Sequence, residues 1–385
     1  MEVFFIYKEE ITMEKYAIPE GTRDLILGEC NAKKALQKRI ETVFDAYGYD
    51  EVITPSIEYY RTYSQGFVSL KEEEMYKFFD HNNAILTLRM DMTVPIARMA
   101  ATKFKHHKSP LRFRYCANVY KVKQYFAGKR NEVSDCGIEL LGQSAKESDL
   151  EILMCAMEVM EQLSDKPFTL ELGDVRFFHE ACREARLSST EMNTLADLID
   201  RKSLTELSTY VNQLRLTEAE KQFFEQLPWF CGDVEVLQEA KQYCFNDTLK
   251  NILNDLQKYY DGLCELGYGS HVTFDLGKLP HLNYYSGLLF EGFVEGIGTS
   301  VLSGGRYDSL LAKFGNDMPA IGFSVKLDYV LDVLEQKNEP KTILYYPANL
   351  KIEALKQAKE LRKSKRVALC QSEDYNEITC KEENL

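Results

Sequence analysis

Strand-like runs rich in β-branched and aromatic residues follow one another in adjacent pairs along most of the chain, and this pairing constrains the fold most. Neighbouring strands with short connections favour an antiparallel sheet, whereas single strands alternating with helices would favour a parallel one. Helical periodicity falls between the pairs, notably over residues 31–48 and 148–163. The predicted strands cover residues 51–54, 85–89, 111–115, 118–123, 137–141, 168–172, 272–275, 287–293 and 299–302. We therefore expect an α+β fold in which helices flank an antiparallel sheet.

The strand signal is interrupted between residues 176 and 263, where polar, Leu-rich helical periodicity replaces it. We interpret this block as a helical insertion within the sheet-forming core. A further amphipathic helix is expected from Val325 to Leu334, before a linker at Pro340. The tail supplies one strand, one helix and one strand, a βαβ unit too short to stand as a domain. The expected parts are an extension at 1–15, a core at 16–175 and 264–338, the insertion at 176–263 and the βαβ remnant at 339–385.

The composition excludes two broad classes of protein. Of 385 residues, 45% are hydrophobic, which is far too many for a disordered chain and enough for two or three domains. The 47 Lys and Arg residues against 60 Asp and Glu residues give a net charge of −13. Such a surface repels polyphosphates, so broad nucleic-acid binding is not expected. Met13 opens a second plausible start, and the choice between Met1 and Met13 stays open.

Cysteine and histidine spacing predicts neither a metal site nor a disulfide framework. The ten cysteines include no Cys-x-x-Cys pair, and the six histidines include no His-Glu-x-x-His motif. We expect no metal and no cofactor, and the scattered thiols are typical of a reduced, cytoplasmic protein. No apolar stretch approaches the roughly 20 residues that span a bilayer, so no membrane association is expected.

Six short segments combine glycine, aromatic and charged residues in a distinctive order. Each segment alone has an ordinary interpretation as a turn, a strand or a half-buried acid–base pair. The segments are Glu20-Gly-Thr-Arg-Asp24, Thr87-Leu-Arg-Met-Asp-Met-Thr93, Asn118-Val-Tyr-Lys-Val-Lys123 with Cys136-Gly-Ile-Glu139, Leu282-Asn-Tyr-Tyr-Ser-Gly287, Ser303-Gly-Gly-Arg-Tyr-Asp308 and Met318-Pro-Ala-Ile-Gly-Phe323. Together they resemble the catalytic core of class II histidyl-tRNA synthetases and of their non-synthetase paralogues, the regulatory subunits of ATP phosphoribosyltransferase. The resemblance covers residues 16 to about 335 and implies a mostly antiparallel sheet that dimerises through the region around 31–48.

Three arginines that this resemblance implies are missing. Class II synthetases hold the phosphates of ATP with a motif-2 and a motif-3 arginine, because a guanidinium suits bidentate phosphate binding. The matching positions hold Lys121 and Tyr329, and the arginine of the histidyl-specific segment is replaced by Pro280. Each such group is typically worth about 3 kcal/mol of transition-state stabilisation. With the anticodon-binding domain reduced to residues 339–385, we expect no synthetase activity, no catalytic residue and no tRNA partner.

The polar residues that would recognise free histidine are retained. By the resemblance, Asp91 and Thr93 meet the ammonium group, and Glu139 faces the imidazole. Asp135 adds a second negative charge near the ammonium, and Lys121 serves as the counter-charge of the carboxylate. Acids suit an ammonium, and a carboxylate selects a ring that carries an N–H donor.

Three tyrosines, Tyr284, Tyr285 and Tyr307, are expected to wall the imidazole ring and to hydrogen-bond it. Arg89 and Arg306 lie beside these segments, and we expect both to be structural ion-pair partners. The alternative interpretation is that the pocket residues only support the fold. Whether histidine binds in this pocket or at a subunit interface stays open.

The resemblance implies a non-catalytic regulatory subunit acting in the first step of histidine biosynthesis. In the family, a short-form ATP phosphoribosyltransferase catalytic subunit needs this partner for activity and for feedback inhibition by free histidine. The implied assembly is a hetero-octamer built on dimers of this chain. The alternative is an enzyme, either a diverged histidyl-tRNA synthetase or another amino-acid-activating protein. The surface that meets the catalytic subunit, and whether residues 340–385 fold, stay open.

Overall fold

In the computed structural model, the described residues are 16–66, 72–107, 110–122, 130–279, 284–335 and 340–383. They belong to two compact units. The larger unit contains residues 36–333 and the segment up to Arg23, and the smaller unit contains residues 24–35 and 334–385. The extension predicted at residues 1–15 lies outside the described residues.

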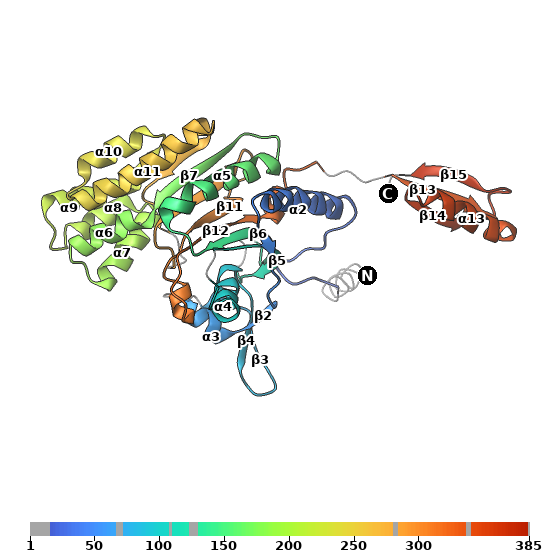
Figure 1. The fold of residues 1–385 in the computed structure, drawn as a ribbon, viewed down its shortest axis with the longest axis horizontal. Helices are drawn as coiled ribbons and strands as arrows, with labels where there is room; N and C mark the ends of the chain where they lie inside the picture. Colours follow the sequence, from blue (N-terminus) through green and yellow to red (C-terminus); the bar gives the residue numbers. More distant parts are fainter. Residues whose placement is uncertain are drawn as a thin grey trace, which may run out of the picture. The chain divides into compact units, whose positions relative to one another are not determined.

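The larger unit is built on a nine-stranded sheet in the order β1-β5-β6-β12-β11-β10-β7-β9-β8 (Figure 1). Neighbouring strands pair antiparallel, except that β1 with β5 and β7 with β9 pair parallel. The strands are β1 (Asp50–Glu51), β5 (Leu111–Tyr120), β6 (Glu132–Leu141), β12 (Ala320–Lys326), β11 (Leu302–Arg306), β10 (Leu288–Val294), β7 (Phe168–Asp174), β9 (Val272–Asp275) and β8 (Cys231–Gly232). The predicted α+β class is confirmed. The predicted strand 111–115 and the start of the predicted strand 118–123 belong to the single strand β5, which ends at Tyr120, and residue 123 lies outside the described residues.

Two long helices, α2 (Gly28–Ala46) and α5 (Ala145–Leu163), confirm the periodicity seen in the sequence. Leu36, Ile40 and Phe44 of α2 are fully buried, and the ring centroid of Phe44 lies 5.8 Å from that of Phe323 in β12. Each such fully buried side chain contributes about 2 kcal/mol. The chain leaves α2 through Gly48, whose φ of +76° favours glycine.

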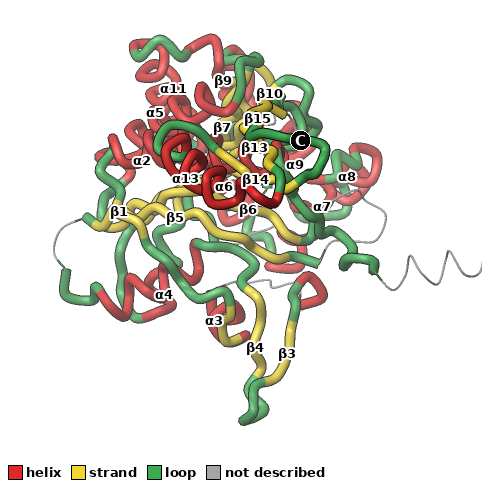
Figure 2. The backbone as a smooth tube through the Cα atoms, turned by 90° about the vertical axis from the view of Figure 1, so that its right-hand side faces the viewer, coloured by secondary structure: helices red, strands yellow, loops and turns green. Residues whose placement is uncertain are grey.

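A smaller sheet in the order β2-β4-β3 precedes helix α4 in the larger unit. Its elements are β2 (Ile57–Tyr59), β3 (Lys77–Phe79) and β4 (Ile85–Leu88), with α3 (Tyr60–Gly66) and α4 (Thr93–Lys103). Figure 2 shows α3, α4 and the hairpin of β3 and β4 together on one side of β5 and β6. The predicted pocket segment 87–93 therefore runs from the end of β4 to the first residue of α4.

The insertion between β7 and β9 consists of six helices (Figure 1). They are α6 (Val175–Glu184), α7 (Ser189–Asp200), α8 (Leu204–Val211), α9 (Glu218–Gln226), α10 (Glu235–Tyr243) and α11 (Asp247–Glu265). Ser188 and Thr217 begin α7 and α9 with capping boxes, which satisfy otherwise free N–H donors. The insertion also contains the short strand β8, which pairs with β9 at the edge of the main sheet.

The predicted helix from Val325 to Leu334 is wrong. Strand β12 continues through Lys326, and α12 (Leu327–Val330) is a single turn. The apolar spacing matched a helix face, but β12 is paired on both sides, with β6 and with β11, and this pairing decides the conformation. Similarly, β11 begins at Leu302 and not at residue 299.

The smaller unit contains more than a βαβ unit. Parallel strands β13 (Lys341–Tyr346) and β14 (Val367–Gln371) are connected through α13 (Lys351–Leu361). A third strand that the sequence analysis missed, β15 (Thr379–Glu383), pairs antiparallel with β13. In both units, none of the described helices is long and apolar enough to cross a membrane.

Candidate ligand-binding cavity

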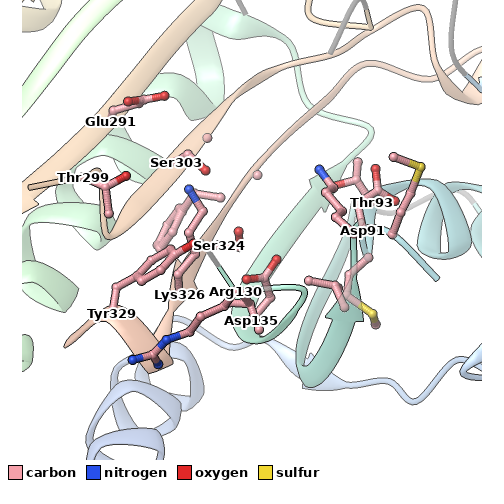
Figure 3. A pocket seen from close by; sticks show the side chains of 18 of the residues that line it. Asp91, Thr93, Arg130, Asp135, Glu291, Thr299, Ser303, Ser324, Lys326 and Tyr329 are labelled. Atoms are coloured by element: carbon pink, nitrogen blue, oxygen red, sulfur yellow. The ribbon is translucent and has the colours of Figure 1, made fainter. Parts of the chain in front are cut away.

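A cavity of about 860 Å³ lies on the face of the main sheet opposite α2 and α5 (Figure 3). The alternation of side chains along β5 identifies this face. Arg112 and Arg114 form ion pairs with acids of α5 and α2, whereas Tyr115 lines the cavity. Seven of the residues predicted for a histidine pocket line this cavity: Asp91, Thr93, Lys121, Asp135, Tyr284, Tyr285 and Tyr307.

The eighth predicted residue, Glu139, lies beneath the cavity lining and is only 1% exposed. Its Oε1 accepts a hydrogen bond of 2.7 Å from the Thr93 hydroxyl, and its Oε2 accepts one from the Tyr307 hydroxyl. Glu139 is paired in register with Gly322, where an added Cβ would lie 1.9 Å from Oε2. Glycine at this position therefore makes room for the carboxyl group. Burial raises the pKa of Glu139 to about 8, although both hydrogen bonds act in the opposite direction.

Asp91 precedes helix α4 and has one oxygen without a partner. Its Oδ1 accepts the Val94 N–H at 3.2 Å, one of the free donors of the first helical turn. Its Oδ2 is buried and has no hydrogen-bond partner among the described residues. Burial raises the pKa of Asp91 to about 6, and the charge of Lys121 opposes this shift. Leaving a buried carboxylate oxygen unpaired costs free energy, which a bound cationic group would offset.

Asp135 in β6 presents a second incompletely bonded carboxylate. Its Oδ1 is buried and lacks a hydrogen-bond partner in the described part of the chain. Asp135 is paired in register with Lys326 of β12. Burial raises the pKa of Asp135 to about 6, while Lys326 and Lys121 lower it. Two separate elements thus bring unsatisfied acids to one cavity.

Four basic side chains line the cavity. Arg130 and Lys278 are held by acidic neighbours at closest distances of 2.7 Å. Lys121 and Lys326 make no ion pair with any residue that the structure describes. Burial lowers the pKa of Lys326. The sequence analysis missed Lys326 and Arg130. Lys326 could have been found because it is a lysine at the end of a mostly apolar strand.

Aromatic side chains form one wall of the cavity. The ring centroid of Tyr284 lies 4.8 Å from that of Tyr285 and 5.8 Å from that of Tyr307. Burial raises the pKa of all three hydroxyls, which therefore remain protonated and can donate hydrogen bonds. This wall combines apolar ring surface with donors.

The two neighbouring arginines stabilise the surrounding structure in different ways. Arg306 forms a buried ion pair with Asp149 and a second ion pair with the more exposed Asp308, which confirms the predicted structural role. The prediction of an ion pair is wrong for Arg89. Its guanidinium donates instead to the backbone carbonyls of Asn118 and Thr54, at 2.7 and 3.0 Å.

The cavity lining is acidic overall, with six acidic residues against four basic ones. Tyr329, at the motif-3 position, lines the cavity, and the Arg130 guanidinium lies 5.8 Å from its ring centroid. Pro280 lies outside the described residues. No group of three or more His, Cys, Asp or Glu side chains within the described ranges could hold a metal ion.

Comparisons with known proteins identify the family. The histidyl-tRNA synthetase family model matches residues 21–330. The ATP phosphoribosyltransferase regulatory subunit of Clostridium botulinum is 32% identical over 356 residues, which cover 90% of this chain and 84% of the relative. That of Clostridium acetobutylicum is 35% identical over 327 residues, covering 84% of this chain and 80% of the relative.

Solved structures agree with this assignment. A Bacillus halodurans protein described as an ATP phosphoribosyltransferase regulatory subunit/histidyl-tRNA synthetase has a TM-score of 0.83 and 28% identity, over 94% of both chains. The histidyl-tRNA synthetase of Nostoc sp. PCC 7120 has a TM-score of 0.75 at 20% identity, covering 94% of this chain and 87% of that one, and shares the fold. The chain therefore belongs to the ATP phosphoribosyltransferase regulatory subunit family, on the class II histidyl-tRNA synthetase fold.

Proposed function

We propose that this chain is a non-catalytic regulatory subunit of ATP phosphoribosyltransferase and that its cavity binds free histidine. The observation that carries the proposal is a set of unsatisfied charges. Asp91 Oδ2 and Asp135 Oδ1 are buried without hydrogen-bond partners among the described residues, and Lys121 and Lys326 line the same cavity. Two acids and two bases match a zwitterion, whose ammonium and carboxylate have opposite charges. An amino acid is therefore the class of ligand that fits.

The groups below the lining favour histidine among the amino acids. The buried Glu139 carboxyl group accepts hydrogen bonds from the hydroxyls of Thr93 and Tyr307, and its oxygens keep a further acceptor site. An imidazole N–H can donate to this remaining acceptor site, whereas an aliphatic side chain would leave the site without a donor. A buried polar site of this kind rejects ligands that lack the matching donor.

The same cavity is poorly suited to ATP. A triphosphate needs a surplus of basic groups, but the lining has more acids than bases. Tyr329 offers a phenol where a guanidinium would bind phosphate, and Lys121 lacks the bidentate geometry of arginine. These substitutions support a protein that recognises the amino acid without activating it.

The names of the relatives support a catalytic ATP phosphoribosyltransferase chain as the partner. We infer that the partner is of the short form and that dimers of this chain build a hetero-octamer with it. Histidine would inhibit the assembly by binding one of its states more tightly than another. A tenfold preference corresponds to about 1.4 kcal/mol, and substrates of the partner must then weaken histidine binding by the same factor.

Two assays on the purified chain test this function. The chain, mixed with a short-form catalytic subunit, should restore transferase activity, and histidine should inhibit the restored activity. Histidine-dependent exchange between ATP and pyrophosphate should be absent. Robust exchange would overturn the non-catalytic assignment, and a mixture without complex or activity would overturn the partner assignment even if histidine binds.

A further inference from the structure

Strands β5 and β6 carry two cysteines that face each other. Cys116 and Cys136 are direct partners in the strand register. Cys136 is fully buried and Cys116 is half-buried. A hydrogen bond from one thiol to the other, together with burial, raises the pKa of Cys136. No other two cysteines are paired in register in the described sheets.

The backbone hydrogen bonds place this pair where the two strands come closest. In an antiparallel ladder, hydrogen-bonded and non-hydrogen-bonded pairs alternate. The Lys121 N–H donates to the Asn131 carbonyl at 2.8 Å, which marks a hydrogen-bonded pair. Five residues back, Cys116 falls in a non-hydrogen-bonded pair. Arg114 and Tyr120 lie an even number of residues from Cys116, so their backbone groups should point away from β6 as well. The Arg114 carbonyl accepts from the Val52 N–H and the Tyr120 N–H donates to the Arg89 carbonyl, as this assignment requires.

The distance between the backbones suits a disulfide. The Cα atoms of a non-hydrogen-bonded pair lie about 4.5 Å apart, within the range of about 4.4–6.8 Å that disulfides span. We propose that Cys116 and Cys136 form a reversible disulfide when the chain meets a low-molecular-weight disulfide oxidant. A separation of about 4.5 Å is shorter than the usual distance of about 5.5–6 Å, which strains the bond, and strained disulfides are the readily reduced ones.

The chemistry balances with oxidised glutathione as the reagent. The half-buried Cys116, as its thiolate, attacks one glutathione sulfur, and one glutathione leaves as a thiolate that takes up a proton. The Cys136 thiolate then attacks the Cys116 sulfur of the mixed disulfide, and the second glutathione leaves in the same way. Two cysteine thiols are oxidised, two glutathione sulfurs are reduced, and two protons pass from cysteine to glutathione.

The disulfide would also act on the cavity behind it. Tyr115 and Asp135, the immediate neighbours of the two cysteines, line that cavity. Because most disulfides join Cα atoms about 5.5–6 Å apart, the bond changes the spacing of β5 and β6 and displaces both residues, so histidine affinity should change by at least about threefold. This consequence rests on the proposed function, whereas formation of the disulfide does not.

Peptide mapping after incubation of the full chain with oxidised glutathione tests the bond directly. We expect a linked peptide containing Cys116 and Cys136, which dithiothreitol separates. In Cys136→Ala, Cys116 should retain a glutathione adduct, and Cys116→Ala should form no cross-link. The exposed Cys231 and Cys264 serve as reference thiols. A wild-type chain that keeps glutathione on Cys116, or whose pair stays unreacted while the reference thiols react, would overturn the proposal.

Calorimetric titration with histidine tests the effect of the disulfide on the cavity separately from the proposed histidine-binding function. Oxidised wild-type protein should differ from reduced protein in dissociation constant, and Cys116→Ala should show no such difference under the same treatment. Equal constants for oxidised and reduced wild type would overturn the effect on the cavity. Absence of histidine binding in the reduced protein would instead contradict the proposed function, while the mapping still decides the disulfide.

Discussion

The Thr93 hydroxyl donates a hydrogen bond of 2.7 Å to Oε1 of Glu139, joining the first residue of α4 to a buried acid of β6. Glu139 thereby connects the helix that begins with Thr93 to the centre of the main sheet. Its carboxyl group accepts two hydroxyl donors before any ligand arrives. The Glu139 carboxyl group should therefore affect both the stability of the fold and the binding of histidine, and measurements at different pH values can separate the two effects.

The stability of the ligand-free chain should fall as pH rises from the pKa of Glu139 in the unfolded chain to its higher pKa in the folded chain. Burial raises the pKa of Glu139 from an ordinary 4.5 to about 8, so the folded state keeps a proton that the unfolded state has lost. The free energy of unfolding then decreases between about pH 4.5 and 8, by at most about 1.4 kcal/mol per pH unit. Urea unfolding from pH 6 to 8 should show a shallower decrease for Glu139→Gln than for wild type.

The window from pH 6 to 8 isolates this residue because Asp91 and Asp135, each with a pKa of about 6, titrate mostly below it. Glu151→Gln, at a half-buried acid paired with Arg112 of β5, is the control and should keep the wild-type slope. Identical slopes for Glu139→Gln and wild type would contradict the buried, protonated state of Glu139.

Asp91→Asn should stabilise the empty chain and weaken histidine binding at the same time. The substitution keeps the acceptor for the Val94 N–H but removes a buried charge, whose other oxygen has no hydrogen-bond partner in the part of the chain that the structure describes. We expect the free energy of unfolding at pH 7 to rise by about 1 kcal/mol and the histidine dissociation constant to rise at least tenfold. Denaturant unfolding and calorimetry measure the two effects. A loss of stability together with unchanged affinity would show that Asp91 only supports the fold.

Asp149→Asn should have the opposite effect on stability. Asp149 and Arg306 form an ion pair in which the two side chains are 1% and 4% exposed. Removing the Asp149 charge leaves the buried Arg306 with the partly exposed Asp308 as its remaining acidic partner, and breaking a buried ion pair typically costs about 3–5 kcal/mol. Urea unfolding should detect this loss, and a change below about 1 kcal/mol would contradict a structural role for the pair.

Tyr307→Phe should weaken histidine binding about tenfold. The Tyr307 hydroxyl donates to Glu139 from the aromatic wall, and leaving a buried acceptor without its donor costs about 1–3 kcal/mol. Tyr47→Phe is the matched control, because its hydroxyl donates to Glu158, which does not line the cavity. Calorimetry should give the control a wild-type affinity, and equal losses in both variants would indicate a general effect of losing a tyrosine hydroxyl that donates to a glutamate.

Local patterns predicted most of the regular elements, and the family resemblance predicted seven of the residues that line the cavity. The β-branched runs gave β9 at its observed bounds, and the motif around Thr93 placed this residue beside the cavity. Features that depend on tertiary pairing were not predictable in the same way. Lys326 looked helical because its apolar neighbours have helix spacing, yet pairing with β6 and β11 makes its segment a strand. The position of Glu139 beneath Gly322 likewise arises from register between strands distant in sequence.

The most direct test of the account is a calorimetric titration of the reduced, isolated chain with free histidine at pH 7. We predict saturable binding of one histidine per chain. The dissociation constant should rise at least tenfold in Asp91→Asn and in Glu139→Gln and should stay at the wild-type value in Tyr47→Phe. Absence of binding, or the same affinity in all four proteins, would contradict the assignment of this cavity to histidine.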